Sequence, residues 1–482
     1  MPELHLPLLE VAIALPLIGA LLVLCLRNPQ TARRLSLIVS GISLLCAAGA
    51  WQDFIGLHTR IAHDHWDVLV DFFGHPVLAI DSLSAPLLPL VALLYFLTIL
   101  ATLRTKIARF SFAGTLISEA LTLATLCCQD EWGIIALLSL ATLPPYFELR
   151  ARGKSTRVFV VHMAAFVGLM VLGWSCVRLE GEGVGVVHSL WGIVPLLLAT
   201  LIRSGVAPVH CWLTDLYENA TFGTALLFTS PLAGAYAIAH LVLPIAPGWV
   251  LQSIGVASLV TAVYAAGMAM TQKETRRFFA YLFLSQSSLV LVGLESVSTI
   301  GLTGGLCVWA SVVLALGGFG LTLRALESRF GRIGLEQYRG LYDHVPALAM
   351  CFLITGLGSV GFPGTIGFVG TEILIDGAVE VYPHVGLMVV IAAAMNGIAI
   401  VRAYFLIFTG TRHVSTVPLH VGVAERAAML TLAVLVISGG LFPQPGVSMS
   451  HDAAEEIISE RPATLAPEVE AETGEEAKVE SH

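Results

Sequence analysis

Long apolar runs are the feature that most limits what this chain can fold into. Runs of 17 or more apolar residues recur along almost its whole length, and each is long enough to cross a hydrocarbon core of about 30 Å as a helix. Only 12% of the 482 residues are charged, which leaves too little polar surface to cover a soluble globule of this size. The sequence therefore predicts an all-α protein that crosses the membrane many times.

We expect fourteen membrane-spanning helices, which begin near residues 8, 33, 81, 110, 132, 157, 186, 222, 248, 276, 299, 344, 384 and 424. Lys and Arg gather in the connections on one side of this arrangement, and only Arg60 and Arg178 fall on the other side. Basic loops resist translocation. The basic side is therefore assigned to the cytoplasm, both termini to the outside, and the chain to the inner (plasma) membrane of the cell.

The end of the chain is acidic. The formal net charge of -9 lies almost entirely between Asp452 and Glu480. Few large apolar residues occur there, which is typical of disorder. We expect residues 450–482 to form a disordered tail, which either is simply solvated or serves as a docking peptide.

The sequence lacks the patterns that hold cofactors. Eight cysteines are scattered through or beside the spans without Cys-x-x-Cys spacing, so neither an iron–sulfur nor a zinc site is expected. A Gly-x-Gly-x-x-Gly pattern at 356–361 lies inside a span rather than at a strand-to-helix turn, which argues against dinucleotide binding. We expect no cofactor, metal or catalytic group in this chain, and any enzyme activity should belong to partner subunits.

Two spans carry matched helix breakers. Gly205 and Pro208 fall in the seventh span, and Gly361, Pro363 and Gly364 fall in the twelfth. Proline removes a backbone donor and glycine loosens the chain, so both helices should be interrupted. The breaks are five spans apart, and an odd number of helices per repeat inverts the topology. The sequence predicts two five-helix inverted repeats with broken helices 7 and 12, where ions or protons are handled.

Five motifs, in order, resemble those of the antiporter-like membrane subunits of respiratory complex I, and most of all the M-type subunit. They are AIDSLSAPLLPL from residue 79, SEALTLATLCCQDEW from 118, APVHCWLTDLYENAT from 207, TQKETRRFFAYLFLSQSS from 271 and GFPGTIGFVGTEIL from 361. The resemblance implies a proton-channel fold in which residues 1–109 form helices 1–3 and residues 110–246 form the first repeat. Residues 247–410 then form the second repeat, and residues 411–449 form helix 14.

The same resemblance implies a place in a larger assembly. The chain is expected to be a subunit of a complex I-like assembly, related to NADH–quinone oxidoreductase, with its proton-translocation fold coupled to a partner module. Expected partners are other membrane and peripheral subunits, the lipid bilayer, and H⁺ or Na⁺, but not nucleic acid. Two alternatives stay open: an energy-coupling subunit of an inorganic-carbon uptake complex, and a non-conducting membrane scaffold.

Most of the family's charge relay is absent. The family has a Glu on the fifth helix, a Lys on the seventh, a Lys on the eighth and a Lys or Glu on the twelfth. The matching positions here hold Ser139, Arg203, Leu232 and Thr371. Arg203 keeps a positive charge but does not release its proton at accessible pH. We expect it to act as a fixed counter-charge for a titrating acid, as an anion-steering charge or as part of a structural ion pair.

Four further residues are candidates for the altered relay. Glu119, near the middle of the fourth span, is the acid expected beside Arg203, unless it is a neutral, hydrogen-bonded core group. Glu372 follows the family's twelfth-helix position by one residue, and a local wide turn would bring it onto the same face; otherwise it is structural. His210 and Asp215 follow the first break, and are expected either at a proton entry point or in capping and loop hydrogen bonds.

Overall fold

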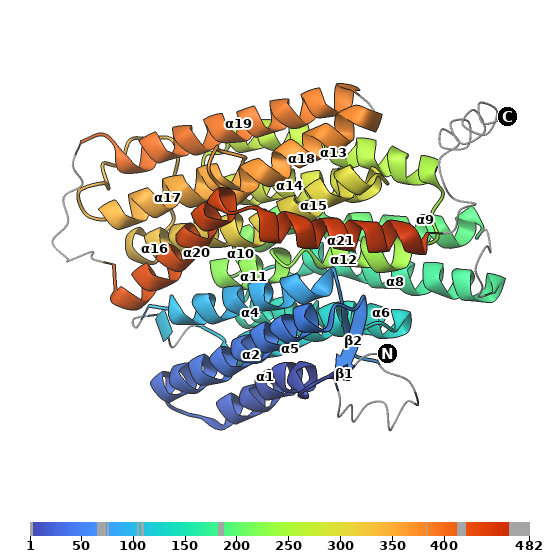
Figure 1. The fold of residues 1–482 in the computed structure, drawn as a ribbon. Helices are drawn as coiled ribbons and strands as arrows, with labels where there is room; N and C mark the ends of the chain where they lie inside the picture. The colour runs from blue at the N-terminus through green and yellow to red at the C-terminus, as the bar shows by residue number, and fades with distance from the viewer. Residues whose placement is uncertain are drawn as a thin grey trace.

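The computed structural model describes residues 3–64, 74, 77–103, 106–107, 110–181, 188–381, 383–411 and 421–461. Within them the chain is a bundle of helices with a small sheet at its margin (Figure 1). Ten helices are long and apolar enough to cross a membrane, and four shorter apolar helices accompany them. A helix begins within four residues of each of the fourteen expected starts. The multi-pass helical fold is confirmed, and the number of crossings and the inverted relation of the repeats stay predictions.

The helices of the first half are α1 (Leu8–Cys25), α2 (Pro29–Leu57), α4 (Ser84–Leu100), α5 (Phe112–Cys127), α6 (Glu131–Leu140), α7 (Leu143–Ala151), α8 (Arg157–Glu180), α9 (Leu190–Ser204), α10 (Cys211–Asn219), α11 (Phe222–Thr229), α12 (Ala233–Ala237) and the π-helix η2 (Ile238–Val242). Those of the second half are α13 (Gly248–Thr271), α14 (Thr275–Glu295), α15 (Thr299–Ser311), the π-helix η3 (Val312–Leu316), α16 (Gly317–Phe330), α17 (Pro346–Ser359), α18 (Ile366–Val381), α19 (Pro383–Phe408), α20 (Val423–Leu441) and α21 (Gln444–Glu460). Strands β1 (Glu3–Leu4), β2 (Ile61–Asp64) and β3 (Ala79–Asp81) pair in that order, β1 parallel to β2 and β2 antiparallel to β3.

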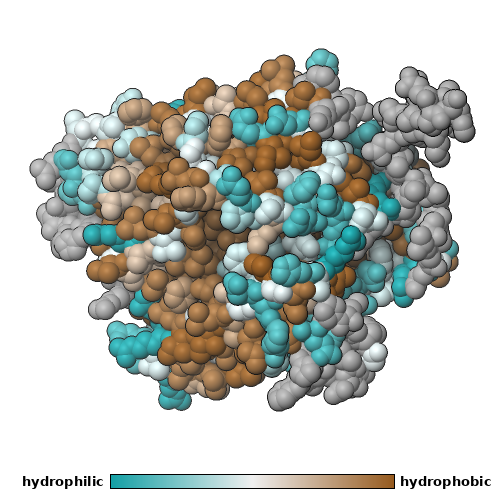
Figure 2. Space-filling model, viewed as in Figure 1, coloured by the Kyte–Doolittle hydropathy of each residue, from teal (hydrophilic) through white to brown (hydrophobic). Residues whose placement is uncertain are grey.

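The centre of the bundle is formed by α14 and α15. The most apolar stretch of α14 is completely buried, whereas only a third of the corresponding stretch is buried in α1, α2, α8, α19 and α20. Outward-facing Leu and Val side chains such as Leu45 and Val434 are more than half exposed, and apolar surface covers broad areas of the face in Figure 2. At the centre, a Cβ added to Gly293 would lie 2.4 Å from the Cα of Gly305, which is too close for any side chain. The two helices therefore pack backbone to backbone, as small residues allow in membranes.

Both predicted helix breaks are confirmed. α9 ends at Ser204 and α10 begins at Cys211, and between them Gly205 has a φ of +77°. α17 ends at Ser359 and α18 begins at Ile366, and Gly361 and Gly364 each have a φ of +85°. Left-handed backbone of this kind ends a helix and is favourable only for glycine. Pro208 and Pro363 lie in the two non-helical segments.

A third interruption was not predicted. α11 ends at Thr229 and α12 begins at Ala233, with Leu232 between them at a φ of +53°. A leucine in the left-handed region is strained, and the π-helix η2 follows within the same span. By the motif resemblance, this interruption falls at the position of the eighth-helix Lys in the complex I subunits.

The expectation of a disordered tail from residue 450 is wrong for residues 450–460. These residues belong to α21, which packs against α15 (Figure 1). Ala453 and Ala454 are buried, and Ile457 and Ile458 pack against the core. The averaged composition of the tail hid this spacing of apolar residues, which is that of an amphipathic helix. Residues 462–482 lie outside the described part.

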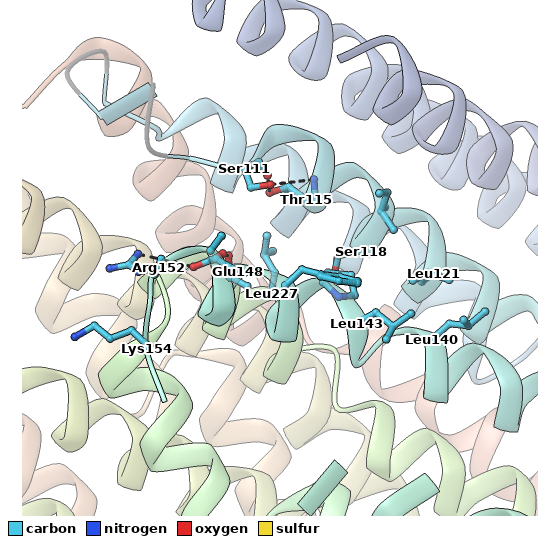
Figure 3. Close-up of a pocket in the computed structure, with 16 residues that line it drawn as sticks. Ser111, Thr115, Ser118, Leu121, Leu140, Leu143, Glu148, Arg152, Lys154 and Leu227 are labelled. Atoms are coloured by element: carbon cyan, nitrogen blue, oxygen red, sulfur yellow. Dashed lines mark hydrogen bonds and ion pairs between the residues drawn. The ribbon is translucent and has the colours of Figure 1, made fainter. Parts of the chain in front are cut away.

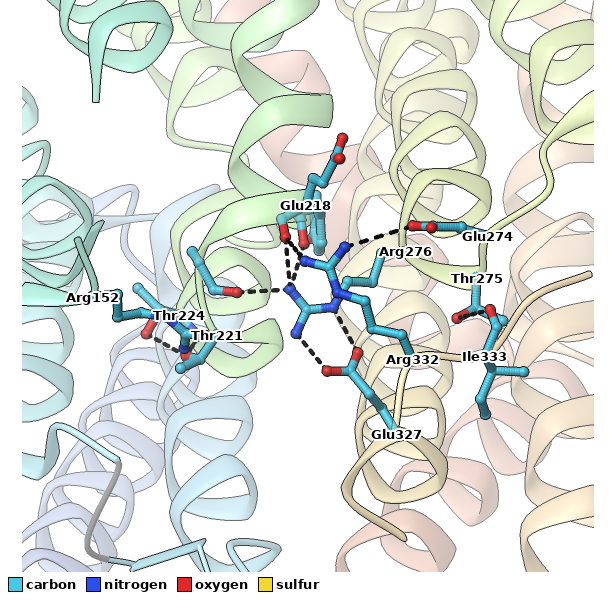
Figure 4. A network of polar contacts seen from close by, with 12 residues as sticks. Arg152, Glu218, Thr221, Thr224, Glu274, Thr275, Arg276, Glu327, Arg332 and Ile333 are labelled. Carbon is cyan, nitrogen blue, oxygen red and sulfur yellow. Dashed lines mark hydrogen bonds and ion pairs between the residues drawn. The ribbon is translucent and has the colours of Figure 1, made fainter. Parts of the chain in front are cut away.

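An arginine holds the end of the broken seventh helix in place. Arg276, on α14, donates from Nη1 to the carbonyls of Tyr217 (2.9 Å) and Ala220 (2.8 Å), which belong to the C-terminal end of α10. Its Nε and Nη2 donate to the two carboxylate oxygens of Glu327 at 2.6 and 2.5 Å (Figure 4). A single buried guanidinium therefore joins α10, α14 and α16.

We predict that Arg276→Met lowers the free energy of unfolding by about 3 kcal/mol, because it leaves a partly buried carboxylate and several carbonyls without their donor. The measurement is steric-trapping unfolding of the purified protein in bicelles. The control is Arg277→Met, which removes a half-exposed neighbour paired with Glu218 at 3.2 Å and should cost less than about 1 kcal/mol. Equal effects of the two variants would contradict the anchoring role of Arg276.

Candidate functional site

Arg203 lies at the point where two helices end. It occupies the last turn of α9 and is only 4% exposed. Its Nη2 donates to the carbonyl of Phe228 at 3.1 Å, and Phe228 is in the last turn of α11. Helix C-termini carry partial negative charge and unpaired carbonyls. The carbonyl ends of α9 and α11 therefore stabilise the guanidinium.

Aromatic rings complete the surroundings of this charge. The guanidinium carbon of Arg203 lies 4.0 Å from the ring centroid of Phe228 and 5.8 Å from that of Trp212. Such cation–π contacts contribute about 0.5–2 kcal/mol each. Trp212 is fixed in turn, because its Nε1 donates to the carbonyl of Ile202 at 2.7 Å.

The expected pairing of Arg203 with Glu119 is wrong. None of the ion pairs among the described residues includes Arg203. Glu119 is completely buried on α5, and its Oε1 accepts a hydrogen bond from Ser40 Oγ of α2 at 2.7 Å. The carboxyl therefore contacts α2 instead of the broken helix. Its Oε2 has no hydrogen-bond partner among the described residues.

Small cavities with some hydroxyl-bearing residues lie beside Arg203, where an acid was expected. The side chain borders two cavities of about 20 Å³ each, and a volume of that size accommodates about one water molecule. Hydroxyl groups line both cavities: those of Ser118, Thr122 and Thr125 the first, and those of Ser204, Thr229 and Ser287 the second. Both linings are otherwise mainly apolar, so each cavity offers a water molecule few partners, and the fixed charge of Arg203 does not titrate.

The other first-half positions of the relay also lack titratable groups. The hydroxyl of Ser139 donates to the carbonyl of Ile135 in its own helix at 2.7 Å. Leu232 is buried at the third interruption. Neither residue can take up and release a proton near neutral pH.

Thr371 and Glu372 are neighbours on α18, beside the second break, and they face in different directions. Thr371 is buried beside the break, and its Oγ1 donates to the carbonyl of Gly367 at 2.7 Å. If Gly361 carried a side chain, its Cβ would lie 3.1 Å from the Thr371 Oγ1. Glu372 is exposed on the outside of α18, which is a regular α-helix. The wide turn considered for Glu372 is therefore wrong, and the structure does not bring it to the break.

The structure brings neither His210 nor Asp215 into contact with Arg203 or Glu119. His210 precedes α10 and is partly buried, with its ring centroid 5.4 Å from that of Tyr264. Asp215 accepts from Asn219 Nδ2 at 3.0 Å, a contact within one turn of α10. Local hydrogen bonding thus accounts for Asp215, and proton entry at these residues stays a prediction.

Two buried acids were missed as site candidates. Glu295 is 1% exposed at the end of α14, and its Oε2 accepts from Ser258 Oγ at 3.2 Å. Asp81 lies 3.6 Å from His240 Nε2, and both border a cavity of about 70 Å³ near Glu456. For Glu295 the available signal was a lone acid at the end of a long apolar run. Asp81 lies in the first of the five motifs, and no sequence signal marked it as a site residue by itself.

We predict that Arg203→Met lowers the free energy of unfolding by about 1–3 kcal/mol, because it leaves the buried Phe228 carbonyl without a donor. Arg402→Met is the matched control, since Arg402 makes the same kind of contact to the Met270 carbonyl at 2.7 Å but is exposed. It should change the stability by less than about 0.5 kcal/mol. Equal or higher stability of Arg203→Met, measured by steric trapping, would mean that burying the charge costs more than its contacts return.

Known proteins share this arrangement. A family model described as NADH:quinone oxidoreductase/Mrp antiporter, TM, matches residues 160–396. NADH-quinone oxidoreductase subunit 13 of Thermus thermophilus is 29% identical over 352 residues, which cover 65% of this chain and 75% of that protein. A chain of respiratory complex I from Thermus thermophilus with bound NADH has a TM-score of 0.82 at 23% identity, covering 95% of this chain and 100% of that chain.

A chain of the Mrp complex from Dietzia sp. has a TM-score of 0.81 at 19% identity, covering 94% of this chain and 97% of that chain. These two structural likenesses show a common fold. The sequence relatives, the matched family model and the two broken helices agree with the resemblance found in the five motifs. Residues 160–396 therefore match the family of membrane subunits of NADH:quinone oxidoreductases and Mrp antiporters, and the chain as a whole is similar to these subunits.

Proposed function

We propose that this chain is a membrane subunit of a complex I-like assembly related to NADH-quinone oxidoreductase. Its antiporter-like fold would be coupled to a partner module that releases energy, and redox cofactors would belong to other subunits. The names of its relatives support this assignment over carbon uptake. The proposed location is the inner (plasma) membrane with both termini outside, because the basic connections then face the cytoplasm.

The observation that carries the proposal is the first broken helix with a buried, permanently charged residue at its end. The break and the positive charge of the family are both kept, at Gly205 and Arg203. The proton-releasing property of a lysine is not kept, since arginine stays protonated. We infer a degenerate relay, in which the fixed charge orders the half-helices and does not itself pass protons.

Glu119 is the titratable group that we assign to proton exchange in the first half. It is buried on α5, one residue from Ser118, which lines the small cavity beside Arg203. Burial favours the neutral form of this carboxyl group, and the hydrogen bond that Ser40 Oγ donates to it favours the charged form. Proton movement in this half would therefore proceed by loading and unloading of Glu119, with water in the small cavities.

We predict that the native assembly, purified and reconstituted in liposomes, conducts protons under an imposed potential and that Glu119→Gln lowers this flux at least tenfold, because the amide cannot carry a proton. Glu372→Gln is the matched control, since Glu372 is exposed away from the break, and it should leave the flux unchanged. A pH-sensitive dye inside the vesicles provides the measurement, and subunit composition confirms that each assembly is intact.

The possible results separate the parts of the proposal. An intact assembly with no flux above empty vesicles would contradict translocation while leaving membership of the complex in place. A flux sensitive to Glu372→Gln but not to Glu119→Gln would move the relay to the second half. Failure of the tagged chain to copurify with quinone-reductase subunits would contradict the assignment to such an assembly.

A further inference from the structure

A wide cavity opens on the outside of the bundle. It measures about 940 Å³ and lies between α5, the α6–α7 connection and α11. Its wall is mainly apolar and includes Ile117, Leu121, Leu140, Leu143 and Phe147. Leu140 is 46% exposed and Phe147 is 58% exposed. The groove is therefore accessible from the surface that faces the membrane.

One end of the groove is strongly basic. The stretch 149–157, LRARGKSTR, places four exposed basic side chains in nine residues: Arg150, Arg152, Lys154 and Arg157. Figure 3 shows Arg152 and Lys154 at one end of the groove, with Leu121, Leu140 and Leu143 toward the other end. The positive-inside rule assigns this basic end to the cytoplasmic surface.

A single acid, Glu148, borders these four basic side chains and pairs with one of them, Arg152. Glu148 accepts from the backbone N–H of Thr221 at 2.7 Å and from the hydroxyl of Thr224, so its carboxylate caps the start of α11. It lies 3.8 Å from Arg152, and it is the only carboxylate in the lining of the groove. The positive charge of Lys154 forms none of the ion pairs among the described residues.

We propose that this groove binds an anionic phospholipid. One acyl chain lies along the leucine wall, and the head-group phosphate lies between Arg152 and Lys154. Basic pockets between membrane helices on the cytoplasmic side recognise anionic head groups, and the apolar wall offers the acyl chain the same burial as the bilayer core. A neutral apolar helix would fill the wall equally well but would leave Lys154 without a counter-charge among the described residues.

The bound lipid would also close the side of the bundle next to Arg203. Ser118 lines both the groove and the small hydroxyl-lined cavity that borders Arg203. An acyl chain against α5 would separate that cavity from the membrane. The lipid therefore has a structural role that does not depend on whether protons move through the chain.

The test measures phospholipid retained by the native assembly. The assembly is placed in nanodiscs of phosphatidylglycerol and phosphatidylcholine, re-extracted in detergent, and its bound lipid is quantified by mass spectrometry. Each basic residue near an anionic head group changes the affinity about fivefold, so Arg152→Ser with Lys154→Ser should weaken phosphatidylglycerol binding roughly thirtyfold. Leu140→Trp, which fills the groove and keeps both charges, should also displace the lipid.

The matched control removes two exposed charges elsewhere on the same expected face, Arg27→Ser with Arg34→Ser, and should leave retention unchanged. Equal losses from the control pair would mean general surface attraction and would overturn the proposal. Retention unaffected by both groove variants would do the same. No phosphatidylglycerol above phosphatidylcholine on the wild-type assembly would mean that a protein element covers the groove.

Discussion

Carbonyl groups at helix ends inside the bundle set the main constraint on this structure. A helix that stops within a membrane leaves its last carbonyls without partners in a medium that supplies little water. Here arginines supply the missing donors, Arg203 at the end of α11 and Arg276 at the end of α10. The broken helices depend on these contacts for their positions.

This constraint explains why arginine can replace lysine at the first break. A guanidinium offers five donors in a rigid fork and stacks on aromatic rings, whereas an ammonium is a compact, strongly hydrated charge that deprotonates more readily when buried. Arg203 uses these properties in its contacts with the Phe228 carbonyl and the rings of Phe228 and Trp212. The substitution exchanges a group that can titrate for one that holds two helix ends together.

The sequence predicted those features that depend on local chemistry. Helix starts follow from apolar runs, and the breaks at Gly205 and Gly361 follow from backbone freedom next to proline. The partner of Arg203 could not be predicted in this way, because it is a backbone carbonyl and every residue has one. The direction of Glu372 depends on α18 staying regular after the break, and the left-handed Leu232 depends on packing that Pro231 alone does not reveal. The order of residues 450–460 comes from contact with α15, which composition does not encode.

The close approach of Gly293 and Gly305 determines which parts of the molecule can move. Because the backbones of α14 and α15 touch with no side chain between them, sliding or separating these helices would open a gap that nothing can fill. We therefore expect α14 and α15 to keep their positions relative to each other. Any conformational change should then occur in the short half-helices around this pair, and not in the packing of α14 against α15.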